Sequence, residues 1–147
     1  MVMRTAAVVA AVVALAACGG GGETRLSHDA YVAKADAICR DIGAKQKRLA
    51  VPTSTGQIPT YVKRALPIFD DALARIHALR PPSELDARVQ AWLDGIAESR
   101  QVVSDIGKAA ERNDAAKVQS LGNKAVTLGE QGRSRAGAIG LTDCAKA

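Results

Sequence analysis

The sequence has 147 residues, enough for one domain, and its 48% hydrophobic and 24% charged residues exclude a disordered chain. Aromatic residues make up only 3%, and the apolar residues are mostly Ala, Val and Leu, which favours helices over a β-sandwich or barrel. The formal net charge of +5 is spread along the chain without an aromatic and basic platform, so we expect no nucleic-acid partner.

Residues 1–17 are predicted to be a signal peptide. Arg4 is followed by an uncharged run, residues 5–18, which is too short for a bilayer span of about 20 apolar residues. The run ends in LAAC at residues 15–18, which resembles the lipobox of bacterial lipoproteins. The resemblance implies cleavage before Cys18, a diacylglyceryl thioether on its sulfur and acylation of the new amino group with a fatty acid such as palmitate. An ordinary secretory signal with an incidental Cys18 is the alternative.

Four glycines, residues 19–22, follow Cys18 and are predicted to start a flexible tether. No strand leads into them, so they match no phosphate-binding loop. A tether over residues 19–26 has a reach of about 15 Å. We therefore divide the chain into a signal peptide (1–17), a lipidated Cys18 with its Gly-rich tether (18–26) and a helical domain (27–147). The lipid on Cys18 would anchor this domain at the extracytoplasmic face of the cell membrane.

Four segments have helical periodicity, and none has a sustained alternation of apolar and polar residues. The first begins at Ser27, a good N-cap, and ends before Pro52. A basic cluster at its end, Lys45, Lys47 and Arg48, is favourable beside a helix C-terminus, although contact with anionic lipid or cell-wall polymer is the alternative. The apolar positions of this helix are Tyr31, Ala35, Ile38, Ile42 and Leu49.

The second apolar pattern extends from Val62 to Leu79 and contains Pro67. A proline inside this pattern predicts either a kinked helix or a regular helix that begins near it. Asp70 and Asp71 are adjacent, and adjacent helix residues point about 100° apart, so they are not expected to form an acid–base pair.

The third pattern follows Ser83, which with Asp86 resembles a capping box, and extends to Ala110. Its apolar spacing alternates between four and three residues, as in a bundle seam. Ser99 falls on this seam, and Arg135 falls on the corresponding seam of the fourth helix. Each polar side chain would set the register, reach out to solvent or line a cavity.

The fourth pattern begins after Asn113 and Asp114, which end the third helix and cap the next. It stops at Gly140, and Leu141 is placed to make the hydrophobic contact that often follows such a stop. Four glycines weaken this helix and indicate either close helix packing, which we favour, or a pliable face that opens for a ligand. They are Gly122, Gly129, Gly132 and Gly137. The short connections predict an all-α, up-down-up-down four-helix bundle.

Cys39 and Cys144 remain once Cys18 is lipidated, and in an exported chain they would form a disulfide. In the predicted bundle the fourth helix ends near the start of the first, and Cys39 lies about 16 Å along the first helix. A C-terminal tail extends back by about 13 Å, and fraying of the last helical turn covers the difference. Closing a loop of about 100 residues is worth up to about 4.7 kcal/mol. Cys39 as a nucleophile is the alternative, but His28 lies about 16 Å away along the helix.

Three segments resemble those of small helical secreted lipoproteins of high-G+C Gram-positive bacteria. They are YVAKADAIC at residues 31–39, PPSEL at residues 81–85 and GLTDC at residues 140–144. The resemblance implies fold and location but supplies no activity.

The sequence offers no convergent catalytic set, so we predict neither an enzyme nor a cofactor. The two histidines, His28 and His77, would form a metal site with Asp29 only if the bundle brought them together, and solvated helix ends are the simpler interpretation.

We predict a membrane-anchored extracytoplasmic lipoprotein that acts as a non-enzymatic binding or accessory domain for an envelope protein or cell-wall component. The alternative is a small-molecule or lipid carrier with a cavity between the third and fourth helices. A large apolar pocket would favour the carrier, and a core without a cavity would favour the first function.

Overall fold

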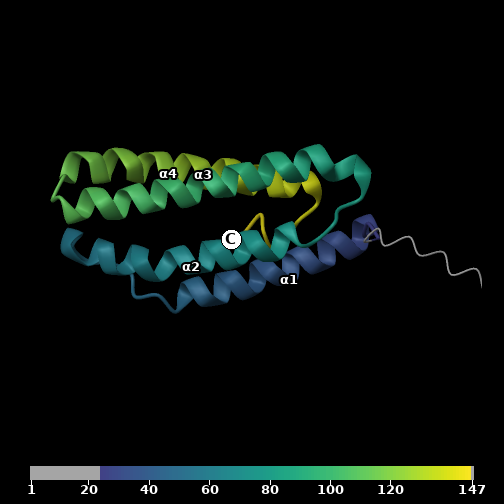
Figure 1. The fold of residues 1–147 in the computed structure, drawn as a ribbon, viewed down its shortest axis with the longest axis horizontal. Coiled ribbons are helices and arrows are strands. Elements are labelled where there is room, and N and C mark those ends of the chain that lie inside the picture. Colours follow the sequence, from purple (N-terminus) through teal and green to yellow (C-terminus); the bar gives the residue numbers. More distant parts are fainter. Residues whose placement is uncertain (1–23, 147) are drawn as a thin grey trace, which may run out of the picture.

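A computed structural model describes residues 24–146, and within this range all regular structure is helical. The long helices are α1 (His28–Lys47), α2 (Ile58–His77), α3 (Asp86–Glu111) and α4 (Ala115–Ile139). Short 3₁₀ helices, η1 (Thr55–Gln57) and η2 (Ser83–Leu85), precede α2 and α3. The long helices lie side by side (Figure 1), which confirms the all-α class and the helical bundle. The predicted signal peptide, the lipidation of Cys18 and the glycine run lie outside the described residues.

The helices are not packed equally around the bundle. α3 packs extensively against both α4 and α2, and α2 packs against α1, whereas α1 and α4 contact each other far less. The chain after α4 crosses back towards α1 (Figure 1), where it is attached through Cys144. The C-terminal tail, residues 141–146, therefore connects α4 to α1, where the two helices make little direct contact.

The apolar core is concentrated around this tail. Tyr31 and Ala35 of α1, Ala136 of α4 and Leu141 of the tail are fully buried in one cluster. The predicted apolar positions of α1 are confirmed, since Tyr31, Ala35, Ile38 and Ile42 are all buried and Leu49 is half-buried. The first half of α4 contributes less, because its predicted core positions up to Ala125 are only half-buried.

Several helix ends follow the predicted chemistry. Ser27 caps α1, and its Oγ accepts the backbone N–H of Ala30 at 3.3 Å. Asp114 caps α4 by accepting the N–H of Lys117 at 2.9 Å. Gly140 ends α4 with a φ of 95°, a left-handed conformation that favours glycine. Leu141 then donates its N–H to the carbonyl of Ala136 at 3.0 Å and is fully buried.

The start of α3 differs from the prediction. Ser83 does not form a capping box, because it lies in η2, and α3 begins at Asp86 without a side-chain cap. The Asp86 carboxylate instead binds the guanidinium of Arg25 at 2.7 Å.

α2 begins well before Pro67 and continues through it, with Pro59 in its first turn.

The folded region begins earlier than the boundary predicted at residue 27. Leu26 donates its backbone N–H to the carbonyl of Arg80 at 2.8 Å and packs against the core. Arg25 contacts both the Pro81 carbonyl and Asp86. Two residues assigned to the tether are therefore held against the connection between α2 and α3.

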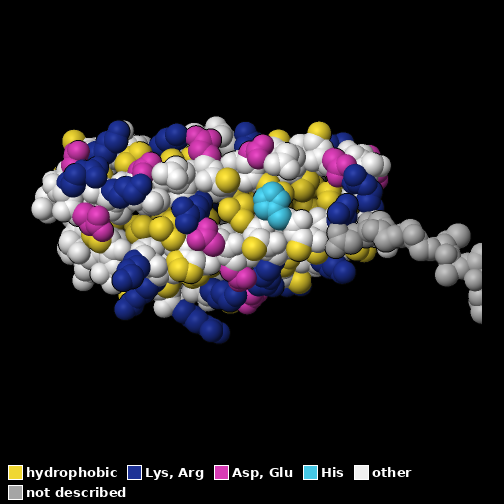
Figure 2. Space-filling model, viewed as in Figure 1, with side chains coloured by type: hydrophobic (Ala, Val, Ile, Leu, Met, Phe, Trp, Pro, Cys, Tyr) yellow, Lys and Arg dark blue, Asp and Glu magenta, His cyan; other side chains and the backbone are white. Residues whose placement is uncertain are grey.

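Ion pairs join neighbouring helices on the surface. Asp71 binds Lys45 of α1 at 2.7 Å, whereas Asp70 binds Arg100 of α3 at 2.8 Å. The two carboxylates thus serve opposite neighbours, which confirms that they do not form an acid–base pair. Lys45 and Lys47 lie in the last turn of α1, as predicted for a basic helix end. Figure 2 shows positive and negative side chains interspersed on one face, with apolar atoms visible between them.

Candidate functional site: an apolar cleft closed by the C-terminal tail

A cleft of about 250 Å³ lies within the bundle, and all four long helices line it. It is larger than the roughly 150 Å³ of an apolar cavity that binds benzene, and it approaches the lower limit of about 300 Å³ for ordinary ligand pockets. The cleft thus extends beyond the α3–α4 seam, where the sequence argument placed a cavity. The apolar side chains that line it are Ile38, Ile42, Phe69, Ala72, Ile76, Trp92, Ile96, Val103, Ala125 and Leu128.

Helical periodicity places these side chains on the inner faces of the bundle. Trp92, the only tryptophan of the chain, is 3% exposed and forms part of the α3 wall one turn before Ile96. Ile38 and Ile42 stand one turn apart on α1. Phe69 of α2 is only half-buried, although the sequence places it on a core position, because the cleft is open beside it.

The glycines of α4 leave space rather than allow close helix packing, so our preferred interpretation of them was wrong. A Cβ atom at Gly122, Gly132 or Gly137 would meet nothing within 4 Å, and one at Gly129 would meet only the Arg133 side chain at 3.6 Å. Gly129 and Gly132 both line the cleft. Their missing side chains therefore contribute to its volume.

The glycines at close contacts are in α3. A Cβ at Gly95 would lie 2.6 Å from Nη1 of Arg135, and one at Gly107 would lie 2.9 Å from the Val62 side chain. Arg135 is exposed and donates to the carbonyl of Ala91 at 3.1 Å, which corrects its predicted core position. Ala136 occupies the buried position of α4 instead. Arg135 therefore covers α3 from outside the core.

Three polar side chains line the cleft. Ser99, predicted on the seam of α3, lines the cleft. Its hydroxyl donates a hydrogen bond to the Gly95 carbonyl of the same helix at 2.9 Å, so this proton is not free to bind a ligand. Gln46 is half-buried at the end of α1. Arg133 of α4 is exposed, which places its guanidinium at the rim, and it is the one ionisable side chain among the described lining residues.

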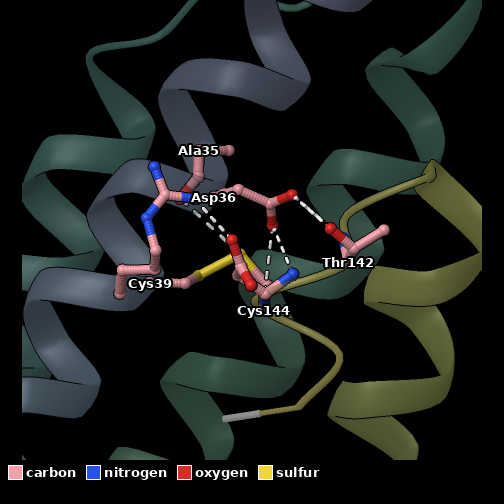
Figure 3. The surroundings of a disulfide bond; sticks show 7 residues. Ala35, Asp36, Cys39, Thr142 and Cys144 are labelled. Carbon is pink, nitrogen blue, oxygen red and sulfur yellow. Dashed lines mark hydrogen bonds and ion pairs between the residues drawn. A yellow bond between two sulfur atoms is a disulfide. The ribbon is translucent and has the colours of Figure 1, made fainter.

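Asp36 holds the tail that closes one side of the cleft (Figure 3). Its carboxylate accepts the backbone N–H groups of Thr142 at 3.0 Å, Asp143 at 2.9 Å and Cys144 at 3.1 Å, and also the Thr142 hydroxyl at 3.0 Å. Burial by itself would raise the pKa of Asp36, but these four hydrogen bonds together hold that pKa below its ordinary value. The charged carboxylate thus satisfies the backbone of a buried tail.

The disulfide between Cys39 and Cys144 is confirmed, with 5.1 Å between the two Cα atoms. Both cysteines line the cleft, so the covalent bond that fixes the tail is also part of the wall. Cys39 therefore has no free thiol for nucleophilic chemistry. This bond could be predicted from the sequence, whereas the role of Asp36 was not predicted. The sequence does contain a signal for Asp36, since this residue follows the buried Ala35 and lies one turn before Cys39 on the same face of α1.

Tyr31 is the one other polar group buried beside the tail. Its side chain is fully buried, and its hydroxyl has no hydrogen-bond partner among residues 24–146. Burial raises the pKa of Tyr31 to about 12. The ring contributes to the core, while the hydroxyl opposes its stability.

The histidines do not assemble a site. His28 Nδ1 lies 3.4 Å from Asp29, its neighbour in the chain, and both His28 and His77 are exposed. Among residues 24–146, no three His, Cys, Asp or Glu side chains are grouped closely enough to hold a metal ion. Within the same range, no helix has the length and apolar run that a bilayer span requires.

Comparison with known proteins adds no relative. No protein-family model, curated protein or solved structure matches this chain.

Proposed function

We propose that this chain is a membrane-anchored extracytoplasmic lipoprotein whose helical domain binds a small apolar molecule or a lipid chain without transforming it. The observation that carries the proposal is the cleft of about 250 Å³ among four helices, lined mainly by aliphatic and aromatic side chains. A carrier is the alternative function that the sequence predicts, and an apolar cleft of this kind favours it.

The composition of the cleft suits an apolar occupant. Each methylene group that leaves water for such a site contributes about 0.8 kcal/mol. Trp92 and Phe69 offer flat surfaces, and the glycines of α4 leave room beside them. Affinity should therefore increase with chain length until the cleft is full.

The predicted anchor supports a ligand drawn from the membrane. Arg25 and Leu26 fix the entry of the chain beside the α2–α3 connection, only seven residues after Cys18. A tether of this length has an r.m.s. reach of about 15 Å. A lipidated Cys18 would hold the domain close to the surface where lipids are the most abundant apolar molecules.

The proposal also includes the order of the helices and a partner outside the cleft. The short connections between the helices favour the up-down-up-down order. An envelope protein or cell-wall component would bind outside the cleft. The two most exposed large hydrophobic side chains among the described residues, Val51 and Val126, belong to different elements, so they do not favour this partner over a ligand in the cleft.

Binding of the neutral fluorophore N-phenyl-1-naphthylamine to the purified full-length Cys18→Ala protein tests this function. Gly132→Leu would insert a side chain into the open space of the cleft, whereas Gly137→Leu adds the same side chain to the same helix away from the cleft lining. We expect saturable binding to the parent protein and to Gly137→Leu, and loss of binding in Gly132→Leu. Equal binding to both leucine variants, with unchanged helical circular dichroism, would refute the cleft as the binding site.

A further inference from the structure

The placement of charge around the cleft points to one ligand class. We propose that the occupant is a single-chain fatty acid, whose carboxylate binds Arg133 at the rim while its chain lies among the apolar side chains inside. This inference rests on the proposed function and adds the chemistry of the ligand's head group.

Arg133 is suited to this contact because nothing in the described residues neutralises it. Among residues 24–146, Arg133 forms no ion pair or side-chain hydrogen bond, and Glu130, one turn earlier on α4, does not bind it. None of the described residues that line the cleft is acidic. An anionic head group at the rim would therefore meet one unpaired guanidinium and no repelling carboxylate.

The surroundings of Arg133 direct its guanidinium towards the open space. Its Nη1 atom lies 3.6 Å from the position that a Cβ of Gly129 would occupy, and Gly129 itself lines the cleft. Gly132, the preceding residue, leaves open space as well. Gln46 of α1 lines the same cleft and adds a neutral amide donor for a carboxylate oxygen.

The volume favours one chain over two. The cleft of about 250 Å³ is smaller than ordinary ligand pockets, which begin at about 300 Å³, so it suits a single chain of medium length better than the paired chains of a phospholipid. The expected ligand is thus an ionised fatty acid rather than a neutral alcohol or a diacyl lipid.

Competition between decanoic acid and decanol for the bound fluorophore tests the inference in full-length Cys18→Ala protein at pH 8. The two competitors share one chain and differ in the head group, so the ratio of their affinities isolates the contribution of the charge. Arg133→Gln should lower the preference for the acid by about fivefold, the upper range for an exposed ion pair, and high salt should lower it in the parent protein. Arg133→Lys should retain part of the preference.

The control is Arg112→Gln, which removes the same charge from an exposed position that does not line the cleft. It should leave the acid-to-alcohol ratio unchanged. An unchanged ratio in Arg133→Gln, with both competitors still displacing the fluorophore, would overturn the fatty-acid inference and leave the apolar cleft intact. Failure of the fluorophore to bind the parent protein would overturn the proposed function and this inference together.

Discussion

The carboxylate of Asp36 accepts the backbone N–H of Cys144 at 3.1 Å, and Cys39, one turn further along α1, is bonded to the same Cys144 through its sulfur. The tail is thereby attached to one face of α1 by a covalent bond and by a charged group. Both attachments matter for function in our account, because Cys39 and Cys144 form part of the wall of the cleft.

Asp36→Asn should lower the free energy of unfolding by at least about 2 kcal/mol at pH 7. Hydrogen bonds to a charged group are worth about 1.5–3 kcal/mol each, and an amide cannot accept all four donors of the tail. Urea denaturation of the two proteins measures this difference. An unchanged free energy of unfolding would show that the disulfide alone secures the tail.

The contribution of Asp36 should also depend on pH. Because its pKa is lowered in the folded state, the stabilisation is fully present above the ordinary aspartate pKa of about 3.9 and is lost as the pH falls through the folded pKa. The difference in stability between the parent protein and Asp36→Asn should therefore shrink below about pH 4. A difference that stays constant down to the acid transition would contradict this assignment.

Tyr31→Phe should have the opposite effect to Asp36→Asn and leave the protein equally stable or more stable at pH 7. It retains the buried ring and removes a hydroxyl that has no hydrogen-bond partner in the described part of the chain. The folded pKa of about 12 lies above the ordinary value of about 10, so Tyr31 destabilises the fold as the pH rises between these values. Thermal denaturation at pH 7 and pH 11 would show this decline in the parent protein and a weaker one in the variant. A destabilised variant at pH 7 would reveal a partner for the hydroxyl.

Reduction of the disulfide should lower the melting temperature by on the order of 10 °C, since a loop of this length is worth up to about 4.7 kcal/mol. The sequence separation of the two cysteines is 105 residues. Reduction should also weaken binding of the fluorophore, because the tail that closes one side of the cleft then loses its covalent bond to α1 and keeps only non-covalent contacts, such as those of Asp36 and the Arg40–Asp143 ion pair. Free thiols at both positions in exported protein would contradict the bond itself.

Lipidation of Cys18 is tested by metabolic labelling with a fatty-acid analogue. The wild-type protein should be labelled and should fractionate with membranes, whereas Cys18→Ala should be unlabelled and soluble. Cys39→Ser is the matched control, because it removes a different cysteine and should keep the label. Labelling of Cys18→Ala at the wild-type level would reject the lipobox assignment.

The ends of helices could be predicted from the sequence where a single residue satisfies the backbone groups at that end. Ser27, Asp114 and Gly140 end or begin helices as expected, because each satisfies backbone groups with its own side chain or conformation. Spacing of apolar residues likewise identified the buried face of α1. Ser83 failed as a cap because the chain forms η2 there, and the Asp86 carboxylate binds Arg25, a residue 61 positions away, instead of closing a capping box.

The cleft could only be predicted in part, because it depends on how four helices fit together. Glycines in α4 indicated either close packing or an open face, and local sequence does not say what lies opposite a missing side chain. Only the assembled bundle shows open space at Gly132 and close contacts at Gly95. Asp36 was missed for a similar reason, since its donors are more than 100 positions away in the chain.

Quenching of Trp92 by a fatty acid brominated on its chain tests whether the cleft is the binding site. Trp92 is the only tryptophan, it is 3% exposed, and it lines the cleft, so its emission reports on this site alone. Bromine quenches only at short range, so the account predicts saturable quenching in the parent protein and in Gly137→Leu, and loss of quenching in Gly132→Leu. Binding of the brominated acid without any quenching of Trp92 would contradict the account, because the chain would then lie outside the cleft.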